Sequence, residues 1–131
     1  MADGLRLSRE ALAAPFVGKV EELSGQNLSA CYQCGKCAAG CLFTEHMDAL
    51  PNQVLRRVQL GDESVLAASA PWACASCLAC AVRCPKGVDV ARVMEALRLL
   101  ALRRGLPHLD PRATAGVPQI ALVGAYRKLT P

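Results

Sequence analysis

Aromatic residues are scarce in this sequence, which has only two Phe, two Tyr and one Trp among its 131 residues. Alanine and leucine supply most of the hydrophobic content instead, with 22 and 19 residues. Strands favour aromatic and β-branched residues, whereas Ala and Leu favour helices with small, close-packed faces. No strand-like alternation interrupts the sequence. We therefore expect an all-α protein with little or no β-structure.

Long apolar runs and long basic runs are also missing. No stretch of 18 apolar residues occurs, and the first ten residues carry four charges where a signal peptide would have its apolar region. We therefore expect no transmembrane segment and a cytoplasmic location. No run of Lys and Arg exceeds two residues, so the sequence gives little sign of a nucleic-acid surface.

Residues for acid–base or nucleophilic catalysis are not brought together by local spacing. The acidic residues are scattered, and no nucleophile stands beside a base. The two histidines, His46 and His108, lie far apart in the sequence, and His108 falls in a Pro-rich tail. We therefore expect that the chain has no catalytic residues of its own.

Cysteine is abundant, and its eight residues form two runs of identical spacing, C-x2-C-x2-C-x3-C. The runs are Cys31, Cys34, Cys37, Cys41 and Cys74, Cys77, Cys80, Cys84. A reducing cytosol seldom stores eight cysteines as disulfides, so this clustering indicates metal. Zinc ribbons use two short-spaced cysteine pairs separated by a longer loop, which fits poorly here. The spacing therefore favours two [4Fe-4S] clusters, with two all-thiolate zinc sites as the alternative.

In bacterial two-cluster ferredoxins of this spacing, the last cysteine of each run binds the other cluster. Transferred to this sequence, the pattern predicts one cluster on Cys31, Cys34, Cys37 and Cys84, and another on Cys74, Cys77, Cys80 and Cys41. His46 could replace a ligand, but a full set of cysteines makes a surface role the better interpretation. Gly35 and Gly40 have few counterparts in the second run, so we expect the two clusters to differ in reduction potential.

Helix signals surround both runs. A helix is expected from about Arg9 to Leu23, another of about ten residues from Pro51, and a short one through Ala68 capped by Asp62. A longer helix should follow the N-cap residue Asp89, and a last one could span 118–129. We expect an N-terminal extension and helix at 1–24, a dicluster ferredoxin domain at 25–105 and a C-terminal tail at 106–131.

Three segments of the sequence together point to one known family: CYQCGKC at 31–37, LPNQVLRRVQLG at 50–61 and WACASCLACAVRCPKGVD at 72–89. They resemble the C subunit of heterodisulfide reductase. The likeness extends over roughly residues 17–105, although Leu42 stands where the family commonly has Pro. It implies an α-helical ferredoxin domain that works within a complex.

The resemblance also implies partners. In such complexes the C subunit passes electrons between an A subunit, which carries flavin and Fe-S clusters, and a B subunit with cysteine-rich domains that acts on a disulfide. We therefore expect a non-catalytic electron-transfer subunit, either in a disulfide-reducing complex or in the sulfur-oxidising branch of the family. A diffusible dicluster ferredoxin is the main alternative, and a structural zinc module is a third.

Overall fold

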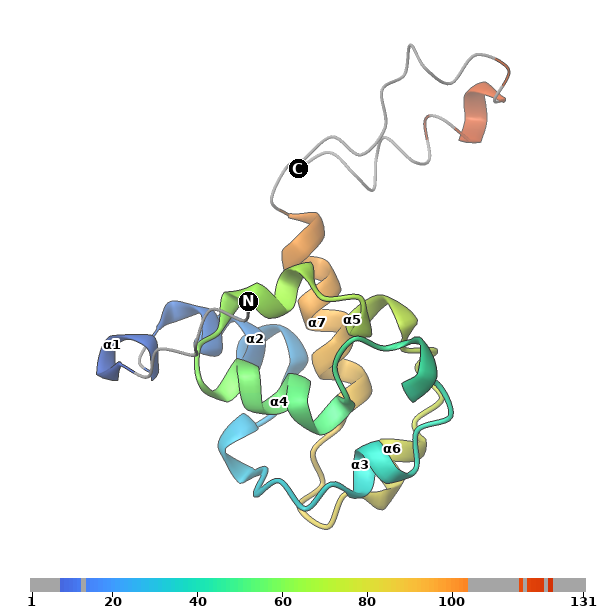
Figure 1. Ribbon diagram of the computed structural model, residues 1–131. Coiled ribbons are helices and arrows are strands. Elements are labelled where there is room, and N and C mark those ends of the chain that lie inside the picture. Colours follow the sequence, from blue (N-terminus) through green and yellow to red (C-terminus); the bar gives the residue numbers. More distant parts are fainter. Residues whose placement is uncertain (1–7, 13, 104–115, 117, 122, 124–131) are drawn as a thin grey trace. The chain divides into compact units, whose positions relative to one another are not determined.

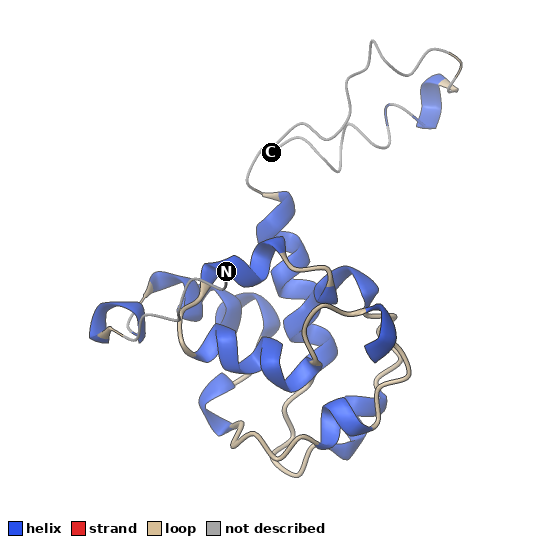
Figure 2. Ribbon diagram, viewed as in Figure 1, coloured by secondary structure: helices blue, strands red, loops and turns tan. Residues whose placement is uncertain are grey.

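The computed structural model describes residues 8–12, 14–103, 116, 118–121 and 123 (Figure 1). Every element within these residues is helical (Figure 2), which confirms the all-α prediction. The chain divides into two units, residues 1–98 and 99–131, and the first unit contains both cysteine runs. The predicted domain limits at residues 24 and 105 stay a prediction.

The N-terminal helix predicted from Arg9 to Leu23 is wrong as a single element. It consists of α1, Arg9–Leu12, and α2, Pro15–Ser24. Pro15 stands at the first turn of α2 and the preceding Ala14 has extended backbone, because a residue before proline disfavours the helical conformation. The predicted end is confirmed, since Gly25 caps α2 by donating its N–H to the Glu21 carbonyl.

The predicted helix at Pro51 is α4, Pro51–Gln59. Its Val54, Leu55 and Val58 are buried on one face, and the helix contacts α2 (Figure 1). The short helix predicted after Asp62 is η3, a 3-10 helix at Glu63–Ala67, and the Asp62 cap is confirmed. Its carboxylate accepts a hydrogen bond from the Ser64 N–H at 3.0 Å.

The helix predicted after Asp89 is α7, Val90–Leu102. The Asp89 carboxylate accepts a hydrogen bond from the Arg92 N–H at 3.2 Å, as expected of an N-cap residue. The side chains that α2, α4 and α7 bury are almost all apolar, and they form much of the core of the first unit. These buried apolar side chains are Phe16, Val20, Val54, Leu55, Val58, Val90, Ala91, Val93, Met94, Ala96 and Leu97.

The cysteine runs are framed by short helices that repeat. A short helix directly precedes the first cysteine of each run: η1, Leu28–Ala30, in the first and α5, Ala70–Ala73, in the second. A second short helix carries the third cysteine: α3, Lys36–Ala39, and α6, Ala79–Arg83. The first run is followed by η2, Thr44–His46. α3 and α6 lie side by side (Figure 1), so the two runs face each other.

In the second unit, residues 119–121 and 123 are helical, within the helix predicted at 118–129. Residue 122 and the part of that prediction from residue 124 onward lie outside the described residues. No helix in the described part of the chain is both long enough and apolar enough to span a bilayer.

Candidate metal centre

Both runs bend through the same backbone conformations. Gln33 and Ser76 lie between the first and second cysteine of their runs, and both have left-handed backbone, with φ of 62° and 55°. Gly35 and Leu78 directly follow the second cysteine and are again left-handed, with φ of 79° and 63°. These turns let the chain wrap a compact centre from one side. For Leu78 this conformation costs roughly 1–2 kcal/mol, because its Cβ crowds the following carbonyl.

The two runs come into close contact at Gly40. A Cβ built on this residue would lie 2.7 Å from both Cδ and Nε of Arg83. Gly40 stands directly before Cys41, and Arg83 stands directly before Cys84, so equivalent positions of the two runs meet here. The absence of a side chain at Gly40 therefore permits the close contact between the runs.

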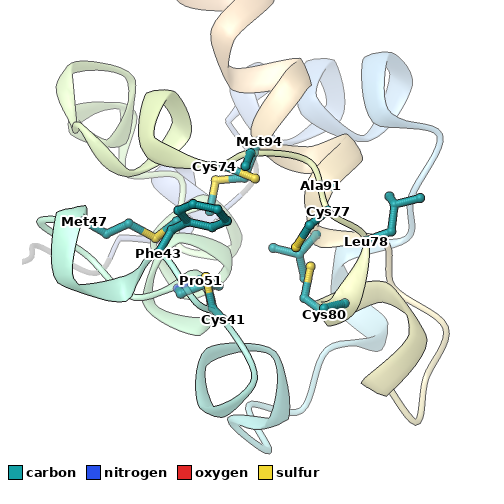
Figure 3. A pocket seen from close by; sticks show the side chains of 13 residues that line it. Cys41, Phe43, Met47, Pro51, Cys74, Cys77, Leu78, Cys80, Ala91 and Met94 are labelled. Atoms are coloured by element: carbon teal, nitrogen blue, oxygen red, sulfur yellow. The ribbon is translucent and has the colours of Figure 1, made fainter.

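The first three cysteines of the second run share one pocket with the last cysteine of the first. Cys74, Cys77, Cys80 and Cys41 all line it (Figure 3). The remaining walls are apolar and include Phe43, Met47, Pro51, Val90 and Met94. Figure 3 shows Cys77 and Cys80 on one side of the pocket and Cys41 on the other. Four sulfurs from both runs thus surround one apolar space.

The last cysteine of the second run lies near the first run. The pKa of Tyr32, which lies between Cys31 and Cys34, is raised. Desolvation is the largest cause, and the nearby Cys34 and Cys84 raise the pKa further. The Lys86 ammonium, two residues beyond Cys84, lies 5.9 Å from the centre of the Tyr32 ring. The segment that contains Cys84 and Lys86 therefore comes near Tyr32, which lies between the first two cysteines of the first run.

Two side chains, Gln26 and Asp48, form hydrogen bonds between the two runs. Each joins the segment that follows one run to the segment that precedes the other. The Gln26 Oε1 atom, five residues before the first run, accepts a hydrogen bond from the Asp89 N–H at 2.9 Å. The Asp48 carboxylate accepts hydrogen bonds from the N–H groups of Ser69 and Ala70, both at 2.9 Å. Ser69 lies five residues before the second run. Each connection thus joins the segment that enters one run to the segment that leaves the other.

Thiol protonation and hydrogen bonding both bear on whether the sulfurs can hold iron. Burial raises the pKa of Cys37 to about 11, and burial likewise raises the pKa of Cys80. These thiols lose their protons when they bind metal, whose positive charge compensates for burying the thiolate. The Cys84 sulfur accepts a hydrogen bond from the Val88 N–H at 3.3 Å, and the Cys31 sulfur accepts one from Gln33 at 3.5 Å. Such bonds to sulfur are typical of Fe-S sites.

All eight cysteines are free, so all eight sulfurs are available as ligands. Among the described residues, no three His, Cys, Asp or Glu side chains come close enough to hold a single ion. A [4Fe-4S] core keeps its four thiolates further apart than one ion does, so this result does not count against a cluster in the pocket that four cysteines share. His46, the alternative ligand, is exposed in η2.

One contact that the sequence does not reveal involves Gln59, the last residue of α4. Its Nε2 atom donates hydrogen bonds to the carbonyl oxygens of Leu28 and Cys31, at 2.7 and 3.0 Å. The helix after the first run thus holds the backbone at its first cysteine. The only signal in the sequence is a polar residue near the end of an otherwise amphipathic helix.

The same contact occurs at the second run. The half-buried Arg98 on α7 donates from Nε to the Pro71 carbonyl and from Nη2 to the Cys74 carbonyl, both at 2.5 Å. Pro71 precedes Cys74 by three residues, just as Leu28 precedes Cys31. The repeat therefore includes a supporting side chain as well as the ligands.

Comparison with known families assigns a class to this centre. Residues 27–88 match the family model of the 4Fe-4S dicluster domain, a range that includes all eight cysteines. The chain is thus a dicluster iron-sulfur protein that binds two [4Fe-4S] clusters, which confirms the cofactor predicted from the spacing. Two such clusters give it an electron-transfer role.

Curated relatives identify the family more closely. The chain is 36% identical over 90 residues to an iron-sulfur C subunit of CoB–CoM heterodisulfide reductase from Methanocaldococcus jannaschii, covering 69% of this chain and 48% of that protein. It is 34% identical over 127 residues to the C subunit of a ferredoxin:CoB-CoM heterodisulfide reductase from Methanosarcina acetivorans, covering 79% and 51%. The match to the iron-sulfur C subunit from Methanopyrus kandleri is 35% over 95 residues, covering 72% and 48%.

The chain therefore belongs to the family of heterodisulfide reductase C subunits, and the resemblance seen in its motifs is confirmed. It spans about half the length of these curated relatives.

Proposed function

We propose that this chain is the electron-relay subunit of a cytoplasmic heterodisulfide-reductase-like complex. In this role it passes single electrons through two [4Fe-4S] clusters between an A subunit with flavin and Fe-S clusters and a B subunit with cysteine-rich domains. The observation that carries the proposal is the paired cysteine centre in a chain homologous to C subunits. The chain contributes binding and orientation of the clusters, and the chemistry on a disulfide or sulfur compound belongs to the partner.

We further propose that the ligand sets cross between the runs. Cys31, Cys34, Cys37 and Cys84 would hold the first cluster, and Cys74, Cys77, Cys80 and Cys41 the second. The pocket shared by Cys41 and the second run supports the second set. The electrostatic effect of Cys84 on Tyr32, a residue between Cys31 and Cys34, supports the first. The clusters would supply reversible one-electron transfer, while the surrounding apolar side chains limit access of water.

Exposed apolar side chains beside the centre support a function within a complex. Leu42, directly after the first run, is 83% exposed, and Val82 in α6 is 86% exposed. Leu78 and Trp72 are each about half exposed. Several large apolar residues at one functional region are typical of surfaces that another protein covers. A diffusible ferredoxin has less need of them.

The complex is tested by anaerobic purification of this chain from its native host, followed by size exclusion and identification of the proteins that remain bound. Co-elution with a flavoprotein and a cysteine-rich protein is the expected result. A brown monomer without partners would contradict the relay and favour a diffusible ferredoxin. A colourless zinc-loaded protein would contradict both.

The ligand sets are tested with single Cys→Ser variants of the holoprotein, in which electron paramagnetic resonance follows each reduced cluster. Cys84→Ser should disturb the same cluster signal as Cys34→Ser. Cys41→Ser should disturb the same signal as Cys77→Ser. If Cys84→Ser and Cys77→Ser instead changed one common signal, each run would bind its own cluster and the crossed arrangement would be wrong.

A further inference from the structure

Gln59 and Arg98 occupy equivalent positions in the repeat. Each lies eight residues after the first residue of its helix, which is Pro51 for α4 and Val90 for α7. Each reaches back to the run that precedes its helix and binds two carbonyl oxygens there. The two contacts therefore differ mainly in charge: a neutral amide supports the first run, and a guanidinium cation supports the second.

The other cations next to the cysteines, Lys36, Arg83 and Lys86, are exposed, so water screens their charges more than the charge of the half-buried Arg98. At the first run, Arg56 donates to the amide oxygen of Gln59 at 3.4 Å, but its side chain is exposed, so water screens its charge. At the second run, the acidic neighbour is Asp89, which acts on Cys80. Asp89 is paired with Arg92 at 3.6 Å, which offsets its negative charge. The half-buried Arg98 is the cation in direct contact with a cysteine backbone.

We infer that Arg98 sets the reduction potential of the cluster on the second run above that of the cluster on the first. Reduction adds one negative charge to a cluster, and a nearby fixed cation stabilises that charge. The Arg98 guanidinium also polarises the Cys74 carbonyl, which draws electron density away from the ligand. A single electron on this chain would then reside on the second cluster. The inference rests on the proposed dicluster relay and names Arg98 as a positioning and tuning residue.

The test is an anaerobic redox titration of the isolated holoprotein, with electron paramagnetic resonance resolving the two one-electron midpoints. Arg98→Gln copies the amide found at the first run. It should lower the higher midpoint by about tenfold in the reduction equilibrium constant, or about 59 mV, and leave the lower midpoint in place. Arg98→Lys keeps the charge and should restore most of the difference. Gln59→Lys adds a cation at the first run and should raise the lower midpoint.

Arg56→Gln is the matched control, because it removes one exposed cation that touches the first run only through Gln59. Its effect on either midpoint should be much smaller than that of Arg98→Gln. The inference is overturned if Arg98→Gln moves neither midpoint, moves both equally, or moves them no more than Arg56→Gln does. The potentials are measured on the protein without partners, so a negative result for Arg98 would not contradict the proposed electron-relay function. Conversely, failure to bind partners would contradict the relay function but would not change the potentials.

Discussion

Two glycines with equally open surroundings should respond to alanine in opposite directions. A Cβ added at Gly35 or at Gly18 would have nothing within 4 Å of it, so neither substitution creates a clash. Gly35 has φ of 79°, a left-handed conformation that costs an L-residue roughly 1–2 kcal/mol. Alanine recovers about 0.4–1 kcal/mol by restricting the unfolded chain. Gly35→Ala should therefore destabilise the protein by about 1 kcal/mol.

Gly18 lies inside α2, where the backbone is already helical. Alanine in a helix interior is more favourable than glycine by about 0.5–1 kcal/mol, so Gly18→Ala should stabilise the protein by that amount. The two variants should thus differ by about 1.5–2 kcal/mol although each adds one methyl group.

The comparison is made on holoprotein with equal iron content, by anaerobic thermal unfolding followed by far-ultraviolet circular dichroism at a single heating rate. A fixed rate is needed because cluster loss makes unfolding irreversible. A domain of this size shifts by roughly 4–8 °C per kcal/mol, so the two midpoints should lie well apart, on either side of wild type. Shifts of the same sign would refute the reasoning, since backbone conformation would then not decide the effect.

Leu78→Gly removes a leucine from a left-handed conformation, and glycine brings its own entropic cost. The free energy of unfolding should therefore change by no more than about 1 kcal/mol, in the stabilising direction. If chemical denaturation instead showed a loss of stability well above that amount, the half-exposed Leu78 side chain would have to contribute packing. For Asp48, burial acts to raise the pKa, but hydrogen bonds from Ser69, Ala70 and the Ser69 hydroxyl outweigh it and the net pKa is lowered. The stability advantage of wild type over Asp48→Ala should therefore be complete above pH 3.8 and decline as the pH falls through the lowered folded-state pKa. Unfolding measured across this pH range would reveal the decline. A stability difference that does not depend on pH would contradict the role of the Asp48 charge. Gly40→Ala should displace the exposed Arg83 side chain and destabilise the protein by about 1 kcal/mol or less. In an Arg83→Ala background the same substitution should no longer destabilise the protein. Additive effects in the double mutant would exclude the contact.

Local signals predicted much of the fold. Pro51 at a helix start and the carboxylates of Asp62 and Asp89 at N-caps act within one turn, so the sequence alone reveals them. Pro15 carries the same kind of signal, and the helix predicted across it should have been divided there. The all-helical class followed from composition because Ala and Leu dominate the apolar residues.

The rest depends on contacts between distant segments. Gln59 and Arg98 are ordinary polar residues of amphipathic helices until folding brings each of them to a cysteine backbone 24 or 28 residues away. Leu78 is a poor candidate for a left-handed position by its own preference, and the surrounding turn imposes that conformation against it. The cysteines were visible as ligands from their spacing, while the crossed assignment stays a prediction.

The hydrogen bonds that join Gln26 to Asp89 and Asp48 to Ser69 bear on how the centre is made. Each connects the stretch leaving one run to the stretch entering the other, so neither half of the centre is a self-contained unit. The contact between Gln26 and Asp89 can form only after the ribosome has released the chain past residue 89. Closure of the whole centre is therefore a late event in the synthesis of the chain.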